Sequence, residues 1–386
     1  MIRPTLLLAV SLTCLQAFAK PLPETRPERE GMSSERLERV TEVANGLVDE
    51  GKLAGVVTLV ARNGRVVLES AVGDRSAADT TPLRADDLFR IYSMTKPITA
   101  TAAMQLYEQG KFHLDDPVEK FVPEFANLKV HSEDGEPVPA ERKMTMLHLL
   151  THTGGLSYGF NPQDPVDQAY GAAKIWEARD LDHFAEVVAE LPLMFEPGGR
   201  WHYSIAVDVT GLVVQRISGQ PFDEYLEEHI FAPLGMDDTF FEVPEAKRDR
   251  FLANHFWNAQ EGKLVPLPAS QPGVAMSDYH NVTLFSGGGG LVSTAMDYMK
   301  FAEAMRAGGT YNKQRILSPK TVNYMTRNHL PASVTSGGSG ENPLASQNER
   351  GFGFGLGFGL RTDAVKGGVV GSAGEFSWGG AAGTVF

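Results

Sequence analysis

The amino-terminal part of the chain changes from a helical to an extended pattern of apolar residues. Residues 36–51 predict an amphipathic helix, because apolar side chains recur there at helical spacing. Two β-branched runs follow at 55–61 and 66–68, separated by Asn63-Gly64. An Asn-Gly pair between two such runs is a strong signal for a hairpin. The chain is therefore predicted to open with a helix and an antiparallel hairpin.

The middle of the chain carries mainly helical patterns. A buried helix is predicted over 98–109, where Gly110 ends it. Few strand signals occur between 111 and 268. The same spacing predicts further helices over 145–150, 182–191, 208–218 and 222–231.

Strand signals return toward the carboxyl-terminal end. Glycines 287–290 lead into a short apolar run at 291–294 and a predicted helix over 295–307. Residues 351–359 alternate glycine with apolar residues, which predicts a strand packed close to another backbone. Residues 331–350 are rich in Ser, Gly, Asn and Pro and predict a surface loop.

Strand signals therefore lie at both ends of the chain, around a middle that reads as a separate, mainly helical region. The composition is that of a folded globular protein, with 42% hydrophobic and 22% charged residues. The formal net charge of −13 makes nucleic acid a poor candidate partner, because nucleic-acid binding calls for a basic face.

The first residues resemble a secretory signal peptide. Arg3 is followed by a mostly apolar stretch from Thr5 to Leu15, and Ala17–Ala19 is a small-residue cleavage site. Cleavage after Ala19 would place the protein in the periplasm or the medium. The stretch is short for a membrane span and no later run of 18 apolar residues occurs, so stable membrane insertion is not expected. The only cysteine, Cys14, would be removed, which leaves no thiol nucleophile, disulfide or cysteine-based metal site.

One tetrapeptide has the pattern of a nucleophile and its base. Ser93-Met-Thr-Lys96 places a hydroxyl and an ammonium at i and i+3, which share one face of a helix. Pro97 suits the first turn of a helix, so the helix should begin near Ser93, at the positive end of its dipole. A partly desolvated lysine there can act as a base. Taken alone, the motif fits an ordinary helix start equally well.

A second serine lies in a different nucleophile pattern. Gly155–Gly159 fits Gly-x-Ser-x-Gly around Ser157, a motif that requires a strand before it and a helix after it. A helical pattern precedes it and a proline-containing segment follows, so Ser157 is interpreted as a loop residue.

Two histidines, a tyrosine and a glycine run could each be functional or structural. His148 and His152 have the i, i+4 spacing of a zinc pair, but Leu149 stands where a metalloprotease has glutamate and no third ligand is evident. They are read as structural histidines, and no metal or organic cofactor is expected. Tyr203, in an aromatic cluster, could pass a proton to a leaving group or be a buried aromatic residue. The four glycines at 287–290 lack the spacing of a phosphate-binding loop.

Three motifs in order resemble those of the serine β-lactamase and penicillin-binding-protein superfamily. Ser93–Lys96 matches its Ser-x-x-Lys motif, and Tyr203–Ile205 stands at the position of Tyr-x-Asn. Trp378–Gly380 stands at the position of Lys-Thr-Gly in its esterase form. Residues 149–155 and 287–294 also look like family segments. The resemblance runs from about residue 30 to the end and is closer to the class C β-lactamase-like esterases, the family VIII carboxylesterases.

The resemblance implies an α+β fold, with an antiparallel sheet flanked by helices and built from both chain ends, 20–110 and 270–386. Residues 111–269 would form an inserted, mainly helical domain, and the active site would lie between the two parts. It implies that Ser93 is acylated while Lys96 and Tyr203 exchange its proton. The backbone N–H groups of Ser93 and Ala381 would form the oxyanion hole. Trp378 would line the acyl or leaving-group pocket.

The chain also departs from the family pattern. The substrate-binding set is expected to be Trp378, Gly379, Gly380 and Ile205. Ile205 replaces an asparagine and Trp378 replaces a cationic lysine, so both changes favour neutral esters over anionic lactams. Residues 381–386 predict the start of a strand. Family members complete this strand, add another and close with a helix, so the final strand and helix are expected to be missing.

Three functional classes follow from these observations. The first is a serine esterase acting on a small-molecule ester of short acyl chain. The second is a β-lactamase or D-Ala-peptidase-like hydrolase that uses the same residues. The third is a truncated, non-catalytic binding protein. The sequence does not predict an oligomeric state.

Overall fold

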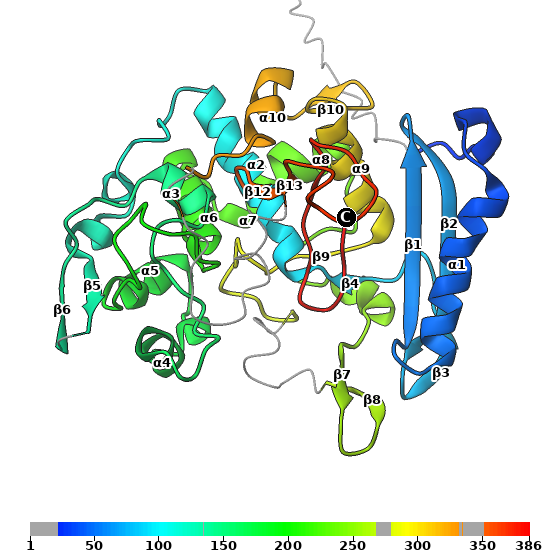
Figure 1. Ribbon diagram of the computed structural model, residues 1–386, viewed down its shortest axis with the longest axis horizontal. Coiled ribbons are helices and arrows are strands. Elements are labelled where there is room, and N and C mark those ends of the chain that lie inside the picture. Colours follow the sequence, from blue (N-terminus) through cyan, green and yellow to red (C-terminus); the bar gives the residue numbers. More distant parts are fainter. Residues whose placement is uncertain (1–21, 134, 268–278, 332–333, 335–350) are drawn as a thin grey trace, which may run out of the picture.

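The computed structural model describes residues 22–386 apart from 134, 268–278, 332–333 and 335–350. The predicted signal peptide and most of the predicted loop over 331–350 lie outside the described residues. Figure 1 shows a long antiparallel hairpin at one end of the molecule, a helical region at the other end, and α2 between them. This arrangement brings segments from the beginning, middle and end of the chain around the start of α2.

The predicted helix and hairpin at the start of the chain are confirmed. The helix α1 (Ser34–Asp49) follows η1 (Pro27–Glu30) and packs against the antiparallel pair β1 (Gly55–Arg62) and β2 (Arg65–Ser76). A third strand, β3 (Asp79–Pro82), pairs with β2. The turn between β1 and β2 requires positive φ at both central residues, and Asn63 and Gly64 adopt φ 53° and 74°.

Helices of the middle region pack around α2. Helix α2 (Thr95–Glu108) follows the short helix η2 (Tyr92–Met94) and contacts α6. The other helices between α2 and residue 250 are η3 (Val118–Lys120), η4 (Pro123–Asn127), α3 (Met146–Leu150), α4 (Pro165–Ala172), η5 (Ile175–Glu177), α5 (Leu181–Ala189), α6 (Ala206–Ser218), α7 (Phe222–Leu226), η6 (Glu227–Phe231), α8 (Ala232–Leu234) and η7 (Glu245–Arg250). Two hairpins that the sequence did not predict also lie in this region: β5 (Lys129–Ser132) with β6 (Gly135–Pro139), and β7 (His255–Asn258) with β8 (Lys263–Pro266).

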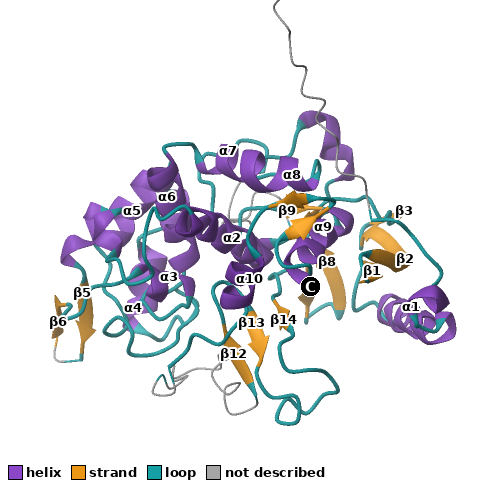
Figure 2. Cartoon of the chain, turned by 90° about the horizontal axis from the view of Figure 1, so that it is seen from above, coloured by secondary structure: helices purple, strands orange, loops and turns teal. Residues whose placement is uncertain are grey.

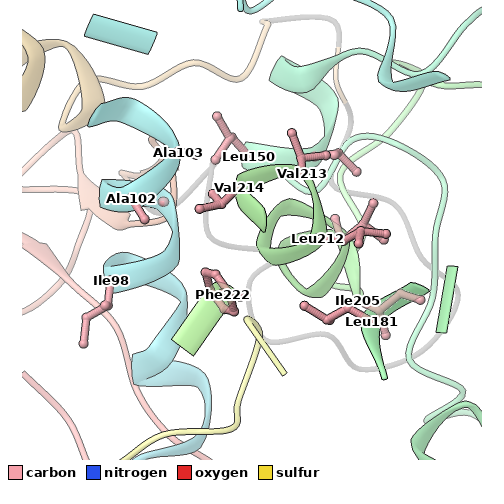
Figure 3. Close-up of a cluster of buried hydrophobic side chains, with 14 of the residues drawn as sticks. Ile98, Ala102, Ala103, Leu150, Leu181, Ile205, Leu212, Val213, Val214 and Phe222 are labelled. Atoms are coloured by element: carbon pink, nitrogen blue, oxygen red, sulfur yellow. The ribbon is translucent and has the colours of Figure 1, made fainter. Parts of the chain in front are cut away.

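The core between α2 and α6 fixes the position of both helices. In Figure 3, Ala102 of α2 faces Val214 of α6, with Phe222 of α7 below them, whereas the Ile98 side chain lies on the other side of α2. All four side chains are fully buried. Figure 2 shows α2 and α6 at the centre of the helical region. Burying a large apolar side chain stabilises the fold by about 1.5–3 kcal/mol, so this contact holds the two helices that carry the polar residues described below.

The described residues of the carboxyl-terminal part form short strands and the helices α9 (Ala295–Arg306) and α10 (Pro319–Met325). The strands are β9 (Val292–Ser293), β10 (Thr310–Tyr311), β11 (Gln314–Arg315), β12 (Phe352–Phe354), β13 (Gly359–Arg361) and β14 (Phe376–Ser377). Both β1–β2–β3 and β12–β13–β14 are three-stranded sheets, and they are separate. Among the described residues, strands from the two ends of the chain pair only where β4 (Phe89–Arg90) meets β9. The fold is therefore α+β with antiparallel sheets. The strands form several small sheets, whereas a single sheet was expected.

Two predictions near the end of the chain are wrong. Residues 351–359 form a strand only over β12 (Phe352–Phe354), and the turn at 355–358 leads into β13 rather than continuing the strand, because Gly357 adopts φ 84° and reverses the chain. The close backbone contact that the glycines suggested is present, since a Cβ on Gly357 would lie 2.4 Å from Ala100 Cβ of α2. Residues 381–386 form a turn in which Gly379 bridges Val385, and Gly383 adopts φ 87°. The turn lets Phe386 pack on Tyr298 instead of extending as a strand.

Candidate active site

Ser93 lies where a strand pair ends and α2 begins. Strand β4 pairs with β9, and the next residue, Ile91, donates its N–H to the carbonyl of Leu291 at 3.1 Å. Tyr92 then adopts φ 40°, a left-handed conformation that costs a bulky residue on the order of 1–3 kcal/mol. The chain turns there into η2 and α2, as the sequence predicted. The strained turn presents Ser93, which is half-buried, at the amino-terminal end of the helix.

The structure brings Ser93, Lys96 and Tyr203 together. Lys96 Nζ lies 3.3 Å from Ser93 Oγ, one helical turn away. The hydroxyl of Tyr203 donates to the same oxygen at 2.7 Å from a segment 110 residues along the chain. Lys96 Nζ also lies 4.5 Å from the centre of the Tyr203 ring. A nucleophile within hydrogen-bond reach of two proton-exchanging groups is the arrangement that covalent catalysis by serine requires.

An aromatic cluster surrounds Tyr203. Its ring lies 5.6 Å from that of Trp378 and 6.3 Å from that of Trp201, and Phe354 of β12 contacts both tryptophans. Trp201 and Phe354 are buried, whereas Trp378 is half-buried. The predicted Trp378 is therefore placed beside Tyr203, and one side of the site is apolar.

Lys96 has two further partners, Tyr158 and Gly288, that the sequence did not identify as site residues. The lysine is fully buried, and its Nζ donates to Tyr158 Oη at 2.7 Å and to the carbonyl of Gly288 at 2.6 Å. Burial, with Asp208 and Tyr203 nearby, raises the pKa of Tyr158 well above its usual value. Tyr158 stood next to Ser157 in the Gly-x-Ser-x-Gly segment, but no local pattern could reveal a role that depends on folding residue 158 against residue 96.

The other residues predicted for the site lie in the helical core or in the turn at the end of the chain. Ile205 is fully buried and belongs to the core beside Leu181 (Figure 3), and its expected contact with substrate stays a prediction. Its backbone caps α6, which turns the side chain into the helical core. Gly379 and Gly380 lie in the terminal turn, and a Cβ on Gly380 would lie 2.4 Å from the carbonyl oxygen of Ile91. Ala381 is exposed in that turn.

Ser157 and the two histidines have structural partners. Ser157 is buried, donates its hydroxyl to Asp167, and lies 3.3 Å from His202 Nε2. Helix α3 precedes it, so the strand-turn-helix context of a nucleophile elbow is missing here. His148 completes the capping box of α3, and burial beside Arg142 lowers its pKa to about 4. His152 is fully buried, and burial together with the charge of Lys96 lowers its pKa well below the usual value.

The described part of the chain holds neither a metal-binding cluster nor a membrane-spanning helix. No group of three or more His, Cys, Asp or Glu residues is arranged there to hold a metal ion. Within the same residues, no helix combines the length and apolar character needed to cross a bilayer.

Comparisons with known proteins agree with this geometry. Residues 40–386 match the Beta-lactamase family. Protein Rv1367c of Mycobacterium tuberculosis is 35% identical over 87% of this chain and 82% of its own length. Esterase EstB of Burkholderia gladioli is 32% identical over 89% of this chain and 84% of its own. The solved structure titled "EstCE1, a hydrolase with promiscuous acyltransferase activity" superimposes with a TM-score of 0.75, at 28% identity, over 90% of this chain and 89% of that one. The chain therefore belongs to the beta-lactamase family.

Proposed function

We propose that this protein is a serine carboxylesterase that cleaves short-chain esters through an acyl-enzyme on Ser93. One observation carries the proposal: Ser93 Oγ lies 3.3 Å from Lys96 Nζ and 2.7 Å from Tyr203 Oη at the start of a buried helix. The similarity to an esterase, EstB, and to a hydrolase, EstCE1, supports the same class of reaction.

The geometry suits two successive acyl transfers. Ser93 Oγ attacks the ester carbonyl carbon while its proton passes to the Lys96–Tyr203 pair. The carbon–oxygen bond to the alcohol breaks, and the alcohol leaves with a proton returned by the same pair. Water then attacks the acyl carbon, gives up a proton to the pair, and Ser93 leaves with a proton. Tyr203 has the shorter contact with Ser93 Oγ and is half-buried, whereas Lys96 is fully buried.

The oxyanion hole is proposed at the backbone N–H groups of Ser93 and Ala381. Ser93 offers an N–H at the start of a helix, where backbone donors lack helical partners. The close approach of Gly380 to Ile91 places the segment before Ala381 beside the segment before Ser93. This packing supports the pairing of the two N–H groups in one hole.

The substrate is proposed to be a neutral ester rather than an anionic lactam. Trp378 stands against Tyr203 and Phe354, so the wall next to the nucleophile is aromatic. An aromatic wall stabilises an apolar acyl or alcohol group by burial, whereas a buried carboxylate without a cationic partner is strongly disfavoured.

Hydrolysis of p-nitrophenyl butyrate and of nitrocefin by the wild type, Ser93→Ala and Ser157→Ala tests the proposal. We expect ester turnover by the wild type, its loss in Ser93→Ala, and its retention in Ser157→Ala, because Ser157 is buried against Asp167. A larger kcat/KM for nitrocefin than for the ester would favour the lactamase or peptidase class. Absence of turnover and of covalent labelling at Ser93 would favour a non-catalytic binding protein.

We also propose that the protein is exported, with cleavage after Ala19. The support is the order of a basic residue, an apolar stretch and Ala17–Ala19 in the first residues. Amino-terminal sequencing of protein from the periplasm and medium of the expressing cell tests this. A first residue of Lys20 is expected, and intact protein confined to the cytoplasm would refute export.

A further inference from the structure

A buried carboxylate lies directly behind Lys96. Asp208 is in the first turn of α6 and is 1% exposed. Its Oδ1 accepts from the hydroxyl of Ser286 and, at 2.9 Å, from the N–H of Gly288. Its Oδ2 accepts from the hydroxyl of Tyr158 at 3.4 Å. Burial raises the pKa of Asp208, while the charge of Lys96 and the hydrogen bonds from Ser286 and Gly288 act in the opposite direction. A carboxyl that receives three donors is an acceptor, which favours its ionised form.

Asp208 and Lys96 share two partners and are joined by both. Tyr158 accepts from Lys96 and donates to Asp208. The peptide of Gly288 accepts from Lys96 through its carbonyl and donates to Asp208 through its N–H. The contact is close, because a Cβ on Gly288 would lie 2.2 Å from Asp208 Oδ2. The two charged side chains are thus linked by two short paths without a direct ion pair between them.

This linkage determines which way the protons of Lys96 point. The carbonyl of Gly288 can only accept, so it takes one N–H of the lysine. Tyr158 gives its own proton to Asp208, so its oxygen takes a second N–H of the lysine. One tetrahedral position of Nζ is left, and Ser93 Oγ lies next to it at 3.3 Å. In the ammonium form this position carries a proton, and in the amine form it carries the lone pair.

We propose that Asp208 is a positioning residue that reserves the one exchangeable position of Lys96 for Ser93. It does so by holding the Tyr158 hydroxyl proton away from the lysine and by fixing the Gly288 peptide. The proposal rests on the proposed function, because it concerns proton transfer during acylation of Ser93. Asp208 itself touches neither Ser93 nor substrate and is not a catalytic residue.

Asp208→Asn separates this role from simple packing. The amide keeps the shape of the carboxyl, but its NH₂ group cannot accept from Tyr158. The Tyr158 proton is then free to point at Lys96 and compete with Ser93 for the lone pair of the lysine. A lysine whose lone pair is directed at Tyr158 instead of Ser93 should react on the order of 10–100-fold more slowly. The loss should fall on the maximal rate of acylation, because no group that binds substrate has changed.

The experiment measures covalent labelling of Ser93 by an alkyl fluorophosphonate as a function of reagent concentration. The proteins are the wild type, Asp208→Asn, Tyr158→Phe, the double variant and Asp297→Asn. Asp297 is a matched control, because it is also buried but pairs with Lys300 on α9. Asp208→Asn should lower the maximal labelling rate on the order of 10–100-fold with an unchanged half-saturating concentration. Asp297→Asn should lower the melting temperature only.

The double variant decides whether Asp208 acts through Tyr158. In the Tyr158→Phe background, Asp208→Asn should lower the maximal labelling rate by less than about a further threefold. The reason is that the hydroxyl that Asp208 controls is already gone. Wild-type labelling by Asp208→Asn, or losses that multiply in the double variant, would overturn the proposal. If Asp208→Asn does not fold, Tyr158→Phe must show the loss by itself, and wild-type labelling of that variant would overturn it. An unlabelled wild type would instead refute the proposed function.

Discussion

The replacement Gly288→Ala should damage the site by steric conflict at one atom. The added Cβ would lie 2.2 Å from Asp208 Oδ2 and 2.8 Å from Tyr158 Oη. Ordinary contact begins at 3.4 Å, so the carboxyl oxygen must retreat by 1.2 Å, the difference between 3.4 and 2.2 Å. Asp208 cannot swing aside easily, because Ser286 and the N–H of Gly288 hold its other oxygen.

The size of the effect follows from this displacement. Overpacking a buried site costs about 1–3 kcal/mol of the free energy of unfolding. Moving the carbonyl that binds Lys96 by about 1 Å should lower ester turnover on the order of 100-fold. A matched control is Gly46→Ala in α1, where a Cβ meets nothing within 4 Å. That replacement should raise stability by about 0.5–1 kcal/mol, because alanine favours the helix.

Urea unfolding and the kcat/KM for p-nitrophenyl butyrate measure the two consequences separately. Gly288→Ala should lose both stability and turnover, while Gly46→Ala should lose neither. Turnover and stability at the wild-type level in Gly288→Ala would refute the packing described around Asp208. Loss of stability with full turnover would show that the Gly288 carbonyl does not control Lys96.

Two further predictions concern Tyr203 and His148. Tyr203→Phe removes the hydroxyl that lies 2.7 Å from Ser93 Oγ. It should lower the steady-state kcat/KM for the ester on the order of 10²–10⁴-fold. A loss below about fivefold would exclude Tyr203 from proton transfer. The pKa of His148 is about 4 in the folded protein, and an unfolded histidine titrates near 6.5, so the native state loses up to about 3 kcal/mol as pH falls through this window. His148→Gln preserves the capping box and should make urea-unfolding stability fall by less between pH 6.5 and 4, with buried His152 still contributing to the fall, whereas an unchanged slope would contradict the assignment.

Local patterns predicted what depends on local geometry. Asn63-Gly64 predicted the β1–β2 hairpin because positive φ at both residues is a property of the turn itself. Ser93–Lys96 predicted a hydroxyl and an ammonium on one helix face for the same reason, and the pair is found one turn apart. Tyr203 was singled out first as a possible proton carrier in an aromatic cluster and then by motif order, and the fold places its hydroxyl on Ser93.

Motif position and local pattern say little where the outcome depends on tertiary packing. Ile205 was expected from its motif position to contact substrate, and that contact stays a prediction, because the side chain at the start of α6 is fully buried in the core. The alternating glycines at 351–359 gave an extended pattern, yet the positive φ of Gly357 reverses the chain against Ala100 of α2. The roles of Tyr158 and Asp208 require contacts between α2, α6 and the glycine segment, which no spacing along the chain encodes.

The central claim is that Ser93, held by Lys96 and Tyr203, is the nucleophile of an acyl-transfer reaction. The most direct test is the intact mass of the protein after treatment with an alkyl fluorophosphonate, followed by peptide mapping. We predict a single adduct, located on Ser93, which is lost in Ser93→Ala and kept in Ser157→Ala. A folded protein that forms no adduct, or that carries the adduct on Ser157, would contradict the claim.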